Sequence, residues 1–70
     1  MFTQTIDQKT SSSKYRWYID CGDVDSDMEG YADTLEQAQD RADTCASFCP
    51  FAYVYIYDLD NNVIDAYWAK

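Results

Sequence analysis

Residues 52–58 read Ala-Tyr-Val-Tyr-Ile-Tyr-Asp, and this stretch decides the fold class. Aliphatic residues alternate strictly with tyrosines, which is the period of a β-strand, because successive side chains of a strand point to opposite faces. Aromatic and β-branched residues also favour strands. The stretch therefore predicts a strand with Val54 and Ile56 on one face and a tyrosine face made by Tyr53, Tyr55 and Tyr57.

A second strand is expected directly after this one. Asp60-Asn61-Asn62 contains residues that tolerate left-handed backbone conformations, so the chain is predicted to turn back there. Residues 63–68 then return as a strand, with Ile64, Ala66 and Trp68 expected on the core side. The other side would carry Val63, Asp65 and Tyr67.

A third strand is predicted earlier, over residues 14–20, where Tyr15, Trp17 and Ile19 alternate with polar or tyrosine positions. Residues 21–33 hold both glycines and many acids, with little that could be buried, and we interpret them as an acidic loop. Residues 1–13 are polar and end in a Ser/Thr run. They are expected to form a tail, or at most an edge strand around residues 2–6.

One helix is expected between the acidic loop and the tyrosine-rich strand. Thr34 is a suitable N-cap, because its hydroxyl can accept a hydrogen bond from the backbone N–H of Gln37 while the Gln37 side chain reaches back. Pro50 disfavours helical geometry at the residue before it and is expected to end the helix. The apolar stripe at helical spacing consists of Leu35, Ala38, Ala42, Cys45, Ala46 and Cys49.

Together these elements predict an α+β protein with the element order β-α-β-β. Its sheet would have three mainly antiparallel strands with one helix packed on one face, and residues 14–70 would form a single domain after the segment 1–13. The core would combine the helix stripe with Trp17, Ile19, Val54, Ile56, Ile64 and Trp68. The opposite sheet face would carry Tyr18, Tyr53, Tyr55, Tyr57 and Tyr67. Because the numbering begins at Met1, we take the chain to be a whole gene product.

The charge balance narrows the class of partner. Thirteen Asp and Glu residues stand against five Lys and Arg residues, with no His, which gives a net charge of -8 in 70 residues. Such a surface repels phosphate, so nucleic acid is not an expected ligand, and it attracts basic protein surfaces or metal cations. No apolar run approaches the roughly 18 to 20 residues of a membrane span, and residues 1–14 lack the pattern of a signal peptide.

The cysteines and the missing histidine bear on chemistry and location. Cys21, Cys45 and Cys49 are an odd number, which argues against a fully paired disulfide framework and favours a reducing cytoplasm. Cys45 and Cys49 are interpreted as small buried apolar residues, since structural zinc needs four ligands. Without histidine, a glycine-rich phosphate loop or a nucleophile motif, the chain is not expected to be an enzyme or to carry a cofactor.

An acid series forms the first candidate binding surface. In an extended segment alternate residues lie about 6.6 Å apart on one side, so the acids of residues 23–29 would form a row resembling a phosphate backbone. The helix acids would continue it on one face. The proposed electrostatic contacts are Asp23, Asp25, Asp27, Glu29, Asp33, Glu36, Asp40 and Asp43, with Tyr53, Tyr55 and Tyr57 as apolar anchors or a dimer seam. The simplest alternatives are an acidic face that is merely solvated and tyrosines that merely suit a strand.

A calcium loop is the competing interpretation of the same segment. Counted from Asp25, the segment 25–36 matches the calcium-loop template at positions one, three, six, nine and twelve, although position five and the helix before the loop do not fit. Gly30 would permit the turn, and Tyr31 would offer its carbonyl. The acids of this candidate Ca²⁺ site are Asp25, Asp27, Glu29, Asp33 and Glu36.

In size, charge and architecture, residues 14–70 resemble the small phage-encoded inhibitors of host defence, the anti-CRISPR and anti-restriction proteins, some of which mimic nucleic acid. The resemblance rests on no sequence motif, so no functional residue is transferred. It implies a non-enzymatic inhibitor in the cytoplasm of a host cell that occupies the basic, nucleic-acid-binding surface of a larger protein or nucleoprotein. The alternatives are a general protein-interaction module or a homodimer formed through the tyrosine face.

Overall fold

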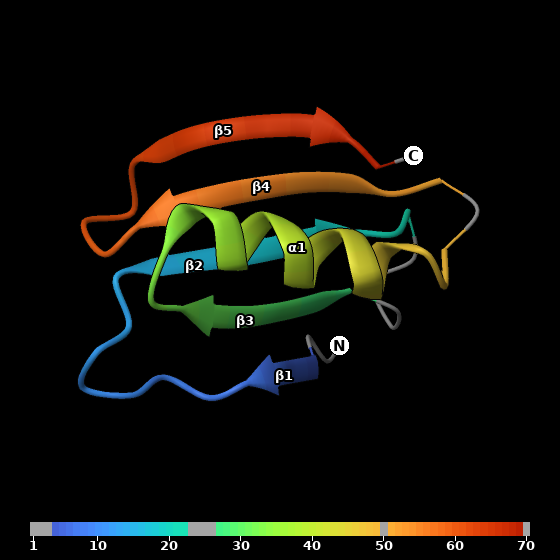
Figure 1. The fold of residues 1–70 in the computed structure, drawn as a ribbon. Coiled ribbons are helices and arrows are strands. Elements are labelled where there is room, and N and C mark those ends of the chain that lie inside the picture. Colours follow the sequence, from blue (N-terminus) through green and yellow to red (C-terminus); the bar gives the residue numbers. More distant parts are fainter. Residues whose placement is uncertain (1–3, 23–26, 50, 70) are drawn as a thin grey trace.

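Five strands and one helix make up the part of the chain that the computed structural model describes, residues 4–22, 27–49 and 51–69. The elements are β1 (Gln4–Asp7), β2 (Tyr15–Asp20), β3 (Met28–Ala32), α1 (Leu35–Ala46), β4 (Tyr53–Asp58) and β5 (Val63–Trp68). The strands form one sheet in the order β1-β3-β2-β4-β5, and Figure 1 shows α1 lying across one face of it. The predicted α+β class with one helix is confirmed, whereas the predicted three-stranded sheet is wrong.

One of the two additional strands comes from the segment expected to be an acidic loop, and the other from the segment expected to form a tail or at most an edge strand. β3 lies inside the predicted acidic loop and pairs antiparallel with β2, with Trp17 opposite Gly30. β1 pairs parallel with β3 at the edge of the sheet, with a register shift between Thr5 and Asp7. The N-terminal segment therefore forms an edge strand, which is the second of the two conformations expected for it.

Trp17 is the largest side chain of the core, and its position explains why β3 contains a glycine. It is fully buried, as are Ile19, Val54 and Ile56, in agreement with the sequence-based core. A Cβ placed on Gly30 would lie 2.4 Å from Cζ2 of the Trp17 indole, which is far inside the contact distance. The indole thus lies directly on the β3 backbone, and any side chain at position 30 would displace it.

The helix begins as predicted and ends earlier than predicted. The Thr34 hydroxyl accepts a hydrogen bond from the backbone N–H of Gln37 at 3.1 Å. Ala38, Ala42, Cys45 and Ala46 are buried against the sheet, which confirms most of the stripe. Leu35 is 38% exposed, because it is the first helical residue and helical side chains lean toward the N-terminus, past the packed turns.

The chain turns before β5 as predicted, with Asn61 at φ 66°, but the two faces of β5 are the reverse of those predicted. Tyr67 lies opposite Val54, so it points to the helix side, where its hydroxyl donates to Asp43 at 3.1 Å. Burial, followed by this hydrogen bond, raises the pKa of Tyr67. Trp68 lies opposite Tyr53 on the tyrosine face and is 68% exposed. Ile64 and Ala66 are exposed too, so none of the three residues assigned to the core from β5 is buried.

The outer strand β5 has two irregular features at its edge. The pairing with β4 shifts register between Ile56 and Tyr57. The backbone N–H of Ala66 donates to Oδ1 of the adjacent Asp65 at 3.0 Å, and the other oxygen of that carboxylate accepts from Gln39 on α1 at 2.9 Å. The Asp65 carboxylate therefore ties the outer strand to the helix and occupies one of its backbone donors.

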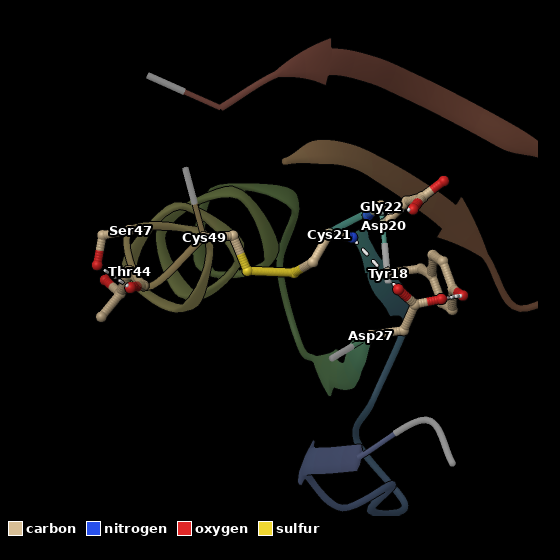
Figure 2. Close-up of a disulfide and its surroundings, with 8 residues drawn as sticks. All are labelled: Tyr18, Asp20, Cys21, Gly22, Asp27, Thr44, Ser47 and Cys49. Atoms are coloured by element: carbon tan, nitrogen blue, oxygen red, sulfur yellow. Dashed lines mark hydrogen bonds between the residues drawn. A yellow bond between two sulfur atoms is a disulfide. The ribbon is translucent and has the colours of Figure 1, made fainter. Parts of the chain in front are cut away.

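A disulfide joins Cys21, which directly follows β2, to Cys49, which follows α1 (Figure 2). Their Cα atoms are 5.9 Å apart and 28 positions separate them in sequence. The interpretation of Cys49 as a free buried residue is therefore wrong, because the fold brings the end of β2 next to the segment that follows α1. Cys45 is free and buried as predicted, and burial raises the pKa of its thiol.

Candidate protein-interaction surface

The face of the sheet opposite α1 carries a continuous group of aromatic side chains. We call this group the aromatic face and define it by its members, Tyr18, Tyr53, Tyr55, Tyr57 and Trp68. The alternation in β2 and β4 that buries Trp17 and Val54 under the helix places the tyrosines on this other side. Within the described residues, no helix or strand packs over it.

The rings of the aromatic face contact one another in series. Tyr55 is central, with ring centroids 5.0 Å from Tyr53, 6.2 Å from Tyr57 and 6.3 Å from Tyr18. Trp68 meets Tyr53 edge to face at 4.9 Å. Because each ring shields its neighbours, the tyrosines are half-buried even though no described helix or strand covers the face. Rings in such contact are held in place by packing and so present a fixed surface to a partner.

A cation already occupies one end of this face. The guanidinium carbon of Arg16 lies 4.3 Å from the centroid of the Tyr57 ring, within the range of a cation–π interaction. Nη1 of the same side chain lies 3.4 Å from a carboxylate oxygen of Glu29 on β3. The arrangement consists of one ring, one guanidinium and one carboxylate from three neighbouring strands.

Asp27 has an internal structural role, which contradicts its assignment as a partner contact. Its side chain is buried and accepts hydrogen bonds from the Tyr18 hydroxyl and from the backbone N–H of Cys21, the latter at 3.2 Å (Figure 2). A carboxylate engaged in this way is not presented to another protein. Asp27 instead anchors the end of the acidic segment to the aromatic face and to the disulfide.

The remaining acids of the predicted series lie in separate places. Glu29 is on β3, on the same side as the tyrosines, and is paired with Arg16. Asp33 is exposed and accepts from the Ser12 hydroxyl at 3.1 Å. Asp23 and Asp25 lie outside the described residues. Exposed acids on the outer side of α1 form what we call the acidic helix surface, Glu36, Asp40 and Asp43.

The acidic helix surface and the aromatic face lie on opposite sides of the sheet. Helix α1 covers the side that buries Trp17, and the tyrosines point the other way. A single flat partner surface cannot contact both, so the two halves of the predicted binding site are not brought together. Among the described residues, the acids on the aromatic side are Asp20, opposite Tyr53 in the register, Glu29, and the buried Asp27 that accepts from Tyr18.

The calcium interpretation does not fit the conformation of this segment. Strand β3 separates Asp27 from Asp33 by about 20 Å, at about 3.3 Å per residue, whereas calcium ligands must converge on one point. Glu29 is engaged with Arg16, and Gly30 is in a strand rather than a turn. Of the candidate ligands, Asp25 lies outside the described residues. Within the described part of the chain, no three acidic or cysteine side chains are grouped to hold a metal ion.

Two features of this surface were missed by sequence reasoning. Trp68 was assigned to the core because Ile64, Ala66 and Trp68 are all apolar, whereas the other side of the strand carries Asp65. In the structure the Asp65 side is the helix side, where its carboxylate accepts from Gln39 on α1. The contact of Arg16 with Tyr57 and Glu29 depends on strand order, which the sequence does not reveal. Outside this surface, a second ion pair, between Arg41 on α1 and Asp7 on β1 at 2.9 Å, depends on strand order in the same way.

No family model, curated protein or solved structure matches this chain. Nor does any helix in the described segments have the length and apolar character needed to cross a bilayer.

Proposed function

We propose that this protein is a non-enzymatic interaction protein that binds a basic, nucleic-acid-binding surface of a larger partner, as inhibitors of the nucleic-acid-mimic class do. The observation that carries the proposal is the aromatic face, an array of contacting rings that no described helix or strand covers, on a chain of net charge -8. Tyrosine and tryptophan are enriched in the centres of protein interfaces, where they supply large rigid contact areas. The negative charge selects basic partners and speeds their approach.

The aromatic face suits arginine-rich surfaces in particular. Proteins that grip nucleic acid present guanidinium groups toward phosphates and stacked bases. Rings and carboxylates side by side offer the same two kinds of contact, which is the arrangement that Arg16 makes with Tyr57 and Glu29. In this proposal the rings provide short-range contacts, and the acids elsewhere on the chain provide long-range attraction.

The test is displacement of nucleic acid from purified basic proteins. A panel of such proteins, each bound to a fluorescently labelled oligonucleotide, is titrated with this chain while fluorescence anisotropy is recorded. The proposal expects release of the oligonucleotide from at least one member, and weaker release as ionic strength rises, because the attraction is screened. If the chain releases oligonucleotide from no member of the panel at low salt, the proposal is contradicted.

Two variants on opposite sides of the sheet locate the binding surface. Tyr53→Ser with Tyr57→Ser reduces the aromatic face, and Glu36→Lys with Asp40→Lys reverses two exposed charges of the acidic helix surface. The tyrosine variant should lose most of the displacement, whereas the helix variant should mainly slow association. Charge reversal at Asp27 is not a usable test, because its buried carboxylate holds Tyr18 and Cys21 in place.

Self-association through the same face is the second candidate. The observation that favours it is Trp68, which is 68% exposed beside Tyr53. Sedimentation at low and high salt distinguishes the two proposals. A chain that binds basic partners should stay monomeric at low salt, because two copies repel each other, and a dimer that persists there would favour self-association.

A further inference from the structure

At one end of the aromatic face Arg16 contacts a ring, Tyr57, and a carboxylate, Glu29. The other end also has rings beside a carboxylate, but no cation of the described residues lies over those rings. There Tyr53 and Trp68 meet edge to face at 4.9 Å. Asp20, at the end of β2, is the residue directly opposite Tyr53 in the antiparallel register, so both side chains lie on the same side of the sheet. Directly opposed residues have Cβ atoms about 4.5 to 5.5 Å apart, which is within reach of a shared ligand.

The chemical groups of this second cluster match those of the first. Indole is the best of the side-chain rings for binding a cation, and Trp68 is 68% exposed. Asp20 is exposed, and one of its oxygens accepts from the backbone N–H of Gly22 at 2.9 Å (Figure 2). A carboxylate has about four acceptor positions, so the Asp20 carboxylate can accept further hydrogen bonds from a ligand beside the one from Gly22. Within the described residues, Arg16 is the only cation placed over a ring.

We propose that Tyr53, Trp68 and Asp20 form a binding site for one arginine side chain of the partner. The guanidinium would stack on the rings while its N–H groups donate to the Asp20 carboxylate, as Arg16 does with Tyr57 and Glu29. Arginine fits this site better than lysine, because a planar and weakly hydrated guanidinium can stack and donate in a fork, whereas an ammonium is a compact hydrated charge. This inference rests on the proposed function and names the side chain that the partner inserts.

A second copy of this chain is a poor source of that arginine. The chain has two arginines, and both are engaged internally, Arg16 with Glu29 and Arg41 with Asp7. Two copies would also bring together two net charges of -8. The occupant is therefore expected to come from a different, basic protein.

The two tryptophans provide a direct assay. Trp17 is fully buried and Trp68 is largely exposed, so acrylamide, an uncharged quencher, reports mainly on Trp68. The probes are octa-arginine, octa-lysine and octa-citrulline, the last being uncharged and close in shape to octa-arginine. We expect octa-arginine to protect Trp68 from quenching and to bind about 5-fold more tightly than octa-lysine, with little effect of octa-citrulline.

Matched variants test the assignment of the site, with affinities measured by anisotropy of fluorescein-labelled peptides. Asp20→Asn keeps an oxygen for the Gly22 N–H and removes the charge, and Trp68→Leu removes the indole. Each should weaken octa-arginine binding about 5-fold and reduce the preference over octa-lysine. Asp60→Asn, an equal charge change in the exposed turn after β4, is the control and should change affinity less than 2-fold, as for a distant screened charge.

The outcomes separate this inference from the proposed function. Equal affinity for octa-arginine and octa-lysine, with Asp20→Asn no different from Asp60→Asn, would overturn the arginine site while leaving binding to basic surfaces in place. No binding of either cationic peptide at low salt would overturn both. Selective octa-arginine binding that depends on Asp20 and Trp68 supports both.

Discussion

Removal of the Cys21–Cys49 disulfide should lower the free energy of unfolding by about 3.6 kcal/mol. The bond closes a loop between positions that are 28 apart. The chain-entropy relation for a loop of that length gives about 12 cal/mol/K, which is about 3.6 kcal/mol at 25 °C. In a small domain with few large core side chains, a loss of this size removes much of the total stability.

The assay compares a Cys21→Ala, Cys49→Ala double variant with the oxidised protein by urea unfolding. Both carry Cys45→Ala, because a free thiol in the unfolded chain could exchange with the disulfide. The expected result is a lower urea midpoint for the double variant. Alkylation of the unreduced wild-type chain in denaturant should modify only Cys45. A difference below about 1 kcal/mol would refute the reasoning that the bond acts by restricting the unfolded chain.

Three further predictions concern single residues. Gly30→Ala should destabilise the fold by about 1 to 3 kcal/mol in urea unfolding, because its Cβ would overlap the Trp17 indole; an unchanged midpoint would contradict that packing. Cys45 should react slowly with thiol reagents in the native protein and quickly in denaturant, since burial shields the thiol and raises its pKa; rapid labelling of the native state would argue against this burial. Hydrogen bonds to the Asp58 carboxylate, the largest effect coming from the Asn62 backbone N–H, lower the pKa of Asp58. The charged carboxylate therefore contributes fully to the free energy of unfolding above the pKa of the unfolded state. This contribution is lost as pH falls through the lower pKa of the folded state. Below about pH 4, wild type should therefore lose more stability than Asp58→Asn, whereas parallel pH profiles would show that the turn does not depend on the charge.

The strands and helix that could be predicted are those whose two faces differ in chemistry. Val54 and Ile56 alternate with tyrosines, and Thr34 provides a clear cap, so β4 and the start of α1 followed from local pattern. β3 was missed because Met-Glu-Gly-Tyr-Ala is a weak strand sequence whose glycine is required by a tertiary contact with Trp17. The disulfide was missed because an odd number of cysteines does not reveal which pair the fold brings together.

The candidate site could be predicted only in part. The tyrosines of β2 and β4 were placed on one face correctly, because successive side chains of a strand alternate between the two faces, whereas Tyr67 of β5 lies on the helix side. Trp68 was placed on the wrong side, since the apolar alternation of Ile64, Ala66 and Trp68 favoured the core, whereas in the structure Asp65 faces the helix and bonds to Gln39. The helix was expected on the face opposite the tyrosines, and it lies there, so the helix acids and the tyrosines named together as partner contacts are on different sides of the sheet. The cytoplasmic location stays a prediction, and the disulfide of Cys21 makes the redox state of purified protein the first quantity to measure.

The irregular outer strands have a consequence for the behaviour of concentrated solutions. A register shift in the pairing of β1, a second shift beside β5, and the Asp65 carboxylate bonded to the Ala66 N–H all interrupt the regular ladder that an incoming strand would need. Sheets whose edge strands are interrupted in this way resist edge-to-edge pairing with other chains, which is the step that builds fibrils. Samples at the millimolar concentrations used for NMR should therefore remain free of amyloid despite the many tyrosines.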